Sequence, residues 1–306
     1  MAETPVVSIV IVTYNCRDLV LRCLATLPAA VATLPFETIV VDNASADGTL
    51  DAIREGFPWV DAVAAGANLG FAAGNNLGLA RTRARVIVFL NPDTEPEPGS
   101  LAGLVRHLDE DAAIGLAGPR LVFPDGSWQP SCRAFPTFGV AVIVLLKLYR
   151  LLRFVPAVRR YDMRGMDDRR PRDVEQIMGA CMAMPRSVLD RVGGFDERFW
   201  MWFEEVDLCL RVRQAGWRVC YRPDAQVMHR MGQSAVLLHS VFAQRMYARS
   251  LVAYFEKHGS PLQARVLRAL SGFGAACAHV VQGVRRVAQP GGRRYRIGER
   301  DAGAGR

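Results

Sequence analysis

Three carboxylates lie within four residues in the segment FWMWFEEVDLCLR, which spans residues 199–211. They are Glu204, Glu205 and Asp207, and they directly follow a run of Phe, Trp and Met side chains. A carboxylate can accept the proton of an attacking alcohol, and apolar surroundings raise its pKa and make it a stronger base. Two other interpretations stay open at this point. Acids also gather at a helix start because the helix dipole favours them, and an aromatic run also packs in a core.

Polar side chains follow three apolar, β-branched segments that end at about residues 13, 42 and 91. Such segments are typical of strands buried on both faces of a parallel sheet. The polar ends are Thr13-Tyr14-Asn15, Asp42-Asn43 and Asn91-Pro92-Asp93. If the strands are parallel neighbours, these ends share one rim of the sheet, where α/β proteins bind their ligands.

Asp42 is a candidate for reading a pyrimidine base on this rim. A carboxylate at a strand end can accept the N3–H of uracil or thymine, and leaving that group unpaired in a half-buried pocket costs about 1–3 kcal/mol. The alternative is that Asp42 caps the turn formed by the following ASADGT segment, which is a common use of Asp.

Asp93 and His229 are the candidate metal ligands. Asp93 follows a strand and a proline, and Mg²⁺ commonly uses one or two carboxylates together with substrate phosphates. His229 ends the segment RVCYRPDAQVMH, and an imidazole ligand favours Mn²⁺ without excluding Mg²⁺. A single histidine is more often structural, so that interpretation stays open as well.

Small residues indicate two places of close backbone approach. The segment GANLGFAAGNNLGLA spaces its glycines four apart, and its amides could bind sugar hydroxyls or cap the following helix. Gly179 and Ala180 form the second place, in a predicted strand. Neither a GxGxxG nor a GxxxxGK[ST] motif is present, which argues against a dinucleotide dehydrogenase and a P-loop NTPase.

The elements that position these residues alternate between strand and helix over the first hundred residues. This alternation predicts a doubly wound α/β sheet with helices on both faces. A strand, a short helix, a Gly-Gly turn, a helix ending at Gly216 and a final strand to His229 are expected after residue 175. Two long helices with basic edges follow from about residue 236.

Charge and cysteine content indicate the cellular compartment and the kinds of partner to expect. The net charge is +8, and the segment after residue 284 contributes much of it through seven arginines. We expect a disordered basic tail at 289–306, a cytoplasmic protein with reduced thiols, and no nucleic-acid partner. The segment FGVAVIVLLKLYRLLRFV is too short and too basic to span a bilayer. It and the C-terminal helices leave two interpretations open, plain packing or peripheral contact with the anionic inner face of the cell membrane.

Six ordered motifs between residues 6 and 235 resemble glycosyltransferase family 2, especially its bacterial rhamnosyltransferase-like branch. They are VSIVIVTYN, IVVDNASADGT, NLGFAAGNNLG, FLNPD, the segment from GACMAMP to QAGWRV, and VMH. The resemblance implies a GT-A fold, a nucleoside-diphosphate sugar donor, a divalent cation and inversion at the anomeric carbon.

The resemblance also implies roles for individual residues. The family's nucleotide-sugar contacts fall on Thr13, Tyr14, Asn15, Asp42, Asn68, Gly70, Asn75, Asn91 and Asp93. The segment from Gly70 to Asn75 matches a loop that closes over the donor. The DxD-type motif reads NPD here, so metal binding depends on Asp93 with His229. The family's ED element places the general base at Glu205, where Asp is more usual, and this leaves the choice between Glu204 and Glu205 open. On the acceptor side we expect Gly179, Ala180, Trp200, Trp202 and Asp207, with Asp207 also supporting the helix.

The predicted organisation is a GT-A domain over 1–235, C-terminal helices over 236–288 and the tail. The nucleotide-binding half covers about 1–120 and the acceptor half about 121–235. The expected reaction is inverting, Mg²⁺- or Mn²⁺-dependent transfer of a sugar, foremost L-rhamnose from dTDP-L-rhamnose, to a saccharide or polyprenyl-linked glycan in envelope polysaccharide synthesis. The alternatives are a UDP-sugar donor carrying GlcNAc, galactose or galactofuranose, a non-catalytic sugar-nucleotide-binding or glycan-binding protein, and a nucleotidyltransferase. The sequence has no Gly-rich, Lys-bearing triphosphate loop near the first strand, which argues against the nucleotidyltransferase.

Overall fold

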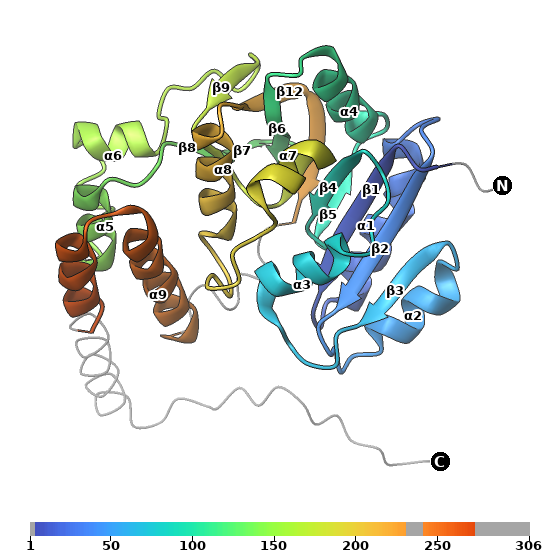
Figure 1. The fold of residues 1–306 in the computed structure, drawn as a ribbon, viewed down its shortest axis with the longest axis horizontal. Coiled ribbons are helices and arrows are strands. Elements are labelled where there is room, and N and C mark those ends of the chain that lie inside the picture. The colour runs from blue at the N-terminus through green and yellow to red at the C-terminus, as the bar shows by residue number, and fades with distance from the viewer. Residues whose placement is uncertain (1–3, 231–240, 273–306) are drawn as a thin grey trace, which may run out of the picture.

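A ten-stranded mixed sheet forms the centre of the protein in the computed structural model, which describes residues 4–230 and 241–272 (Figure 1). Its strands are β1 (Val7–Thr13), β2 (Phe36–Asp42), β3 (Val60–Ala64), β4 (Val86–Leu90), β5 (Thr94–Pro96), β6 (Ile114–Val122), β7 (Trp128–Gln129), β9 (Arg172–Val174), β11 (Cys181–Pro185) and β12 (Arg218–His229). The main path runs in the order β3-β2-β1-β4-β11-β6-β12-β5. Two further strands, β8 (Cys132–Arg133) and β10 (Gln176–Ile177), pair with each other.

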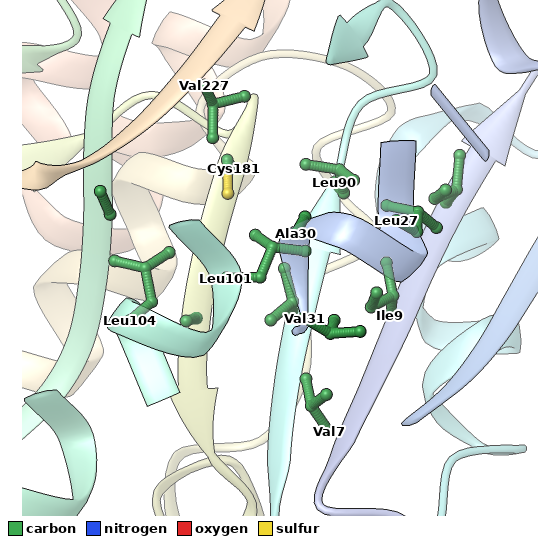
Figure 2. Packing of buried hydrophobic residues seen from close by; sticks show 14 of the residues in the cluster. Val7, Ile9, Leu27, Ala30, Val31, Leu90, Leu101, Leu104, Cys181 and Val227 are labelled. Atoms are coloured by element: carbon green, nitrogen blue, oxygen red, sulfur yellow. The ribbon is translucent and has the colours of Figure 1, made fainter. Parts of the chain in front are cut away.

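Helices cover both faces of the sheet, as the strand–helix alternation predicts. The labelled helices are α1 (Arg17–Ala30), α2 (Thr49–Gly56), α3 (Gly70–Leu79), α4 (Ser100–Glu110), α5 (Phe138–Leu145), α6 (Pro156–Tyr161), α7 (Arg186–Val192), α8 (Glu204–Gln214) and α9 (Val241–His258). Alternate residues of β1 point to opposite faces. Ile9 and Ile11 pack with α1 and α4, and Val10 belongs to the cluster that includes α7 and α8. Figure 2 shows the first of these clusters, which joins Ile9 of β1, Leu27 and Ala30 of α1, and Leu101 and Leu104 of α4.

The sheet changes direction at β11, and this change brings distant parts of the chain together. Strands β3, β2, β1 and β4 are parallel, whereas β11 is antiparallel to both β4 and β6. The last strand, β12, runs parallel to β6 and antiparallel to β5, with His229 opposite Thr94. The end of β12 therefore returns to the residues that follow β4.

Three details differ from the sequence-based expectation. The glycine-spaced segment is mostly helix α3 and not a loop. Its glycines let this helix pack closely on the sheet, since a Cβ at Gly78 would lie 2.5 Å from the Val10 side chain of β1. Gly179 and Ala180 lie in the turn between β10 and β11 and not within a strand. Residue 120, expected near a boundary between two halves, lies inside β6, and the sheet continues through it.

The C-terminal helices pack on the α/β domain. Helix α9 and the helical residues 261–272 bury Leu251, Phe255 and Leu267 against α5 and the aromatic run before α8. No helix within 4–230 and 241–272 is long and apolar enough to cross a membrane. The predicted tail at 289–306, the last part of the predicted helices and the boundary at 235 lie outside the described residues.

Candidate active site

The strand ends β1, β2 and β4 meet on one rim of the sheet, as predicted. Thr13 pairs with Asp42 in the register of β1 and β2, and β4 lies on the other side of β1. Thr13 and Asp42 are buried, whereas the neighbouring Tyr14 is 47% exposed. The rim therefore combines buried polar groups with one exposed aromatic ring.

Asp42 is held in a turn, which is one of its two predicted roles. Its Oδ1 accepts a hydrogen bond from Ser45 Oγ at 2.5 Å, and its Oδ2 accepts one from the Ser45 amide at 3.0 Å. Asn15 supports the same turn, because its backbone N–H donates to Ser45 Oγ and its side-chain Oδ1 accepts from the backbone N–H of Ala46. A carboxylate has further lone pairs, so this geometry is compatible with the base-reading role, which stays a prediction.

The start of α3 contacts the rim and the aromatic run together. Asn43 donates to the Gly70 carbonyl at 3.0 Å, and Asn68 Oδ1 accepts from the Gly70 amide at 3.0 Å. The Phe71 amide donates to the Trp200 carbonyl at 2.8 Å. Gly70 has φ +83°, and an added Cβ would lie 2.5 Å from the Trp200 ring. Glycine is thus required here both by the backbone conformation and by the indole above it.

Other predicted amides on this side have internal partners. Asn75 is buried and donates to the Phe71 carbonyl at 2.9 Å, within α3. The backbone N–H of Asn91 donates to the Ala180 carbonyl at 2.9 Å, while the side-chain Oδ1 atom of Asn91 is buried without a partner. Asn75 therefore stabilises its own helix, and Asn91 keeps one acceptor atom unsatisfied near the rim.

The two predicted metal ligands lie side by side. His229 Nε2 is 3.3 Å from Asp93 Oδ1, and both side chains are buried. His229 Nδ1 lies 2.7 Å from Gln129 Oε1, an acceptor to which Nδ1–H can donate, and Nε2 is the ring nitrogen that faces Asp93. Sequence reasoning missed Gln129, since it lies on the two-residue strand β7 and no motif or spacing marks it.

These residues fit a divalent cation that also binds substrate. No group of three or more His, Cys, Asp and Glu side chains suited to a metal is found in residues 4–230 and 241–272. A two-residue set suits Mg²⁺ or Mn²⁺, which can take their other oxygen ligands from a diphosphate and water. A metal-bound histidine almost always donates its other ring N–H to an oxygen acceptor, and Gln129 Oε1 can serve as that acceptor here.

The acid cluster opens α8 in a strained backbone. Trp202 and Phe203 have φ of +65° and +71°, a conformation that is rare for bulky residues and concentrated at functional sites. Glu204 is buried and Glu205 is half-buried, and the Oε2 atom of each has no partner. Burial raises the pKa of both carboxyls, and the Glu205 charge raises the pKa of Glu204 further.

Glu205 faces the rim through the turn that contains Gly179 and Ala180. A Cβ at Gly179 would lie 3.5 Å from Glu205 Cβ and 3.8 Å from the Phe71 ring. The next residue, Ala180, accepts the Asn91 amide. The small residues therefore let the base candidate approach the strand ends closely, as their type predicts.

Asp207 faces away from this turn. It is fully buried and lies 2.7 Å from Arg211 Nε, 2.6 Å from Lys257 Nζ and 2.6 Å from His258 Nε2. Burial alone would raise its pKa, but the hydrogen bonds from Lys257 and His258 and the Arg211 charge lower it. Asp207 thus connects α8 to α9 through Lys257 and His258, and its acceptor-side role stays a prediction.

The aromatic run divides between core and site. Phe199 and Phe203 belong to the cluster shared with α9, which accounts for them by core packing. The Trp202 ring lies 6.1 Å from that of Tyr247, and Trp200 packs over Gly70. Trp200 is therefore the member of the run that contacts the start of α3.

Comparisons with known proteins agree with this geometry. The profile of glycosyl transferase family 2 matches residues 8–193, and a profile described as the N-terminal domain of galactosyltransferase matches 163–233. N-acetylglucosaminyl-diphospho-decaprenol L-rhamnosyltransferase of Mycobacterium tuberculosis is 32% identical over 244 residues, 76% of this chain and 78% of the relative. Rhamnosyltransferase WbbL of Escherichia coli is 24% identical over 233 residues, 73% of this chain and 83% of the relative.

Solved structures share the fold. Mannosyltransferase PcManGT from Pyrobaculum calidifontis, solved with GDP-Man and Mn²⁺, has a TM-score of 0.55 at 19% identity and covers 94% of this chain, over 77% of its own. GalNAc-T7, solved with UDP, GalNAc and Mn²⁺, has a TM-score of 0.55 at 16% identity and covers 82% of this chain, over 48% of its own. The predicted GT-A fold is confirmed. With its rim, its acid cluster and these relatives, the chain belongs to glycosyl transferase family 2 and is a rhamnosyltransferase-like glycosyltransferase.

Proposed function

We propose that the protein transfers L-rhamnose from dTDP-L-rhamnose, with inversion, to a saccharide or polyprenyl-linked glycan in envelope polysaccharide synthesis. One observation carries the proposal: Glu205 adjoins the Gly179–Ala180 turn, whose Ala180 carbonyl binds the Asn91 amide at the end of β4. The raised pKa of Glu205 and the proximity of Asp93 to His229 support the proposal.

The reaction needs a base on the acceptor side and charge stabilisation on the leaving side. A bond forms between the acceptor oxygen and the anomeric carbon, while the bond from that carbon to the diphosphate oxygen breaks. The hydroxyl proton passes to the Glu205 carboxylate, whose raised pKa makes it a better base towards an alcohol. A divalent cation held by Asp93 and His229 would offset the charge on the departing diphosphate.

The structure favours Glu205 over Glu204 as the base. Glu205 lies beside the Gly179 turn and is partly exposed, whereas Glu204 is 5% exposed. Glu204 would then act as a buried neighbour, whose pKa is raised by burial and by the Glu205 charge.

The sugar and acceptor assignments rest on the relatives. The mycobacterial relative is named for L-rhamnosyl transfer to N-acetylglucosaminyl-diphospho-decaprenol, which supports rhamnose and a lipid-linked acceptor. A UDP-sugar donor is the second candidate, because the Asp42 carboxylate at the strand end would accept N3–H from uracil as well as from thymine.

A donor screen tests the proposal. Thermal unfolding of the full chain is followed with dTDP-L-rhamnose, UDP-GlcNAc, UDP-galactose and UDP-galactofuranose, each with Mg²⁺ and with Mn²⁺. We expect the largest stabilisation with dTDP-L-rhamnose plus metal, followed by rhamnosyl transfer to a GlcNAc-diphosphate-lipid. Greater stabilisation and turnover with a UDP-sugar would contradict the rhamnose assignment, and absence of transfer from every donor would contradict the enzymatic one.

A further inference from the structure

A succession of turns after α5 exposes an unusual number of large apolar side chains. Leu146, Leu148, Leu151 and Phe154 are 39%, 36%, 72% and 71% exposed. We call residues 146–154 the turn surface. Helix α5 itself buries Val140, Ala141 and Leu145, so the apolar segment divides at residue 146 into a packed part and an exposed part.

Basic side chains alternate with these apolar ones. Lys147, Arg150 and Arg153 are exposed, and residues 146–161 contain five basic and no acidic residues. The Arg153 guanidinium lies 4.8 Å from the centre of the Phe154 ring. Exposed leucines and an aromatic ring beside long cations are the composition of protein segments that lie in the interface of an anionic bilayer.

The turn surface adjoins the candidate active site through the first turn of α9. Lys147 Nζ lies 2.8 Å from Gln244 Oε1, and Phe242 in the same turn is 55% exposed. The Phe242 ring lies 6.1 Å from that of Trp200, which packs over Gly70. Figure 1 shows α5, α6 and α9 gathered at the end of the molecule away from β3 and α2.

We propose that the turn surface, together with Phe242, docks the enzyme on a lipid bilayer that contains anionic headgroups. Leu151 and Phe154 insert at the level of the headgroups, and the cations at 147, 150 and 153 contact the lipid phosphates. The contact orients the Trp200 side of the site towards the bilayer, where a lipid-linked acceptor would present its glycan. This orientation rests on the proposed function, whereas the bilayer contact does not.

Vesicle flotation tests the contact. The full chain is mixed with vesicles of phosphatidylcholine alone or of phosphatidylcholine with phosphatidylglycerol, and the bound fraction is measured. We expect binding to the mixed vesicles and at least about fivefold weaker partition for the double variant Arg153→Gln/Phe154→Ser, since each interfacial cation contributes of the order of a fivefold factor.

The matched control is Arg54→Gln/Trp59→Ser, on α2 and in the turn before β3. It also removes one exposed cation and one exposed aromatic ring, 42% exposed, at the far end of the sheet. We expect it to bind vesicles like the unaltered protein. Equal binding by the two double variants, or no preference for the mixed vesicles, overturns the proposal.

A transfer assay separates the two proposals. With a water-soluble acceptor, the turn-surface variant should retain the unaltered rate, and with the same glycan on a vesicle-embedded lipid it should lose several-fold. No transfer by the unaltered protein in either arm would refute the proposed function, and the flotation result would still decide the bilayer contact.

Discussion

The Nε2 atom of His229 lies 3.3 Å from the Oδ1 atom of Asp93, although one residue ends the last strand and the other follows the fourth. The antiparallel pairing of β12 with β5 creates this proximity, because it sets His229 opposite Thr94. Gln129 completes the arrangement by accepting from the other ring nitrogen. The relationship leads to the first two predictions.

Asp93→Ala should abolish metal-dependent donor binding. The substitution removes the only carboxylate beside the His229 Nε2 among the described residues, so one of the two candidate ligands is lost. Calorimetric titration with donor in the presence and absence of Mn²⁺ measures the effect. Asp61→Ala, which removes an exposed carboxylate paired with Arg81, is the control and should bind normally. Unchanged binding by Asp93→Ala would exclude the metal role.

Gln129→Leu should weaken metal affinity by about 10–100-fold, as loss of an outer partner of a metal-bound histidine commonly does. The leucine keeps the volume but leaves His229 Nδ1 without an acceptor, so the ring tautomer is no longer fixed. Gln129→Glu keeps an acceptor and should retain more affinity. Titration of Mn²⁺ by electron paramagnetic resonance reads the metal directly, and equal affinities for the two variants would contradict the orienting role.

Glu205→Gln should lower kcat by about 10²–10⁴-fold, the range expected for loss of a general base, with donor affinity little changed. Glu204→Gln should have a smaller effect, since Glu204 lies deeper and away from the Gly179 turn. The exposed residue Glu55 on α2 provides the control, Glu55→Gln. Near-normal turnover of Glu205→Gln would remove Glu205 from the base role.

The pH dependence should follow from the raised pKa of Glu205. The base acts only when ionised, so kcat/KM should rise with pH through a value above the ordinary glutamate pKa of about 4.3. Activity is therefore lost on acidification earlier than for an exposed glutamate. A pH–rate profile of the unaltered enzyme checks this prediction. A flat profile between about pH 4, near the reference glutamate pKa, and about pH 7 would contradict it.

Gly70→Ala should impair donor binding by disturbing the start of α3. The new Cβ would meet the Trp200 ring at 2.5 Å, in addition to the strain of φ +83°. Gly66→Ala is a close control, because its φ is +76° and an added Cβ meets nothing within 4 Å. Both variants bear the backbone strain of about 1–2 kcal/mol, so a donor dissociation constant that rises for both equally would contradict the Trp200 contact.

Asp207→Asn should destabilise the protein by about 3–5 kcal/mol, the range for breaking a buried ion pair, since it removes the fully buried carboxylate from the half-buried Arg211 and Lys257. Because the folded-state pKa of Asp207 is lowered, its stabilisation is present above the unfolded-state pKa and is lost as pH falls through the lower folded-state value. Urea unfolding at neutral and acidic pH measures both effects. The difference between the two proteins should shrink on acidification, and a pH-independent difference would contradict the assignment.

The sequence by itself determined the parallel strands, their shared polar rim and most of the candidate site. Uninterrupted β-branched runs fix strand positions locally, and parallel strands bring their carboxyl ends to one edge whatever else the chain does. Asp42 and Asp93 could be selected for that reason, whereas Glu205 was selected from the acid cluster and the family resemblance, and His229 from its place at the end of a later strand.

Only the tertiary structure decided which distant side chains meet. Gln129 reaches His229, Trp200 covers Gly70 and Asp207 turns to Lys257 because strands and helices far apart in the chain pack together. The turn surface likewise depends on the tertiary structure, because α5 buries its apolar side chains whereas the turns that follow it leave theirs exposed. Hydrophobic spacing specifies that a residue is buried or exposed within its own element, whereas the partner across an interface depends on how the elements pack.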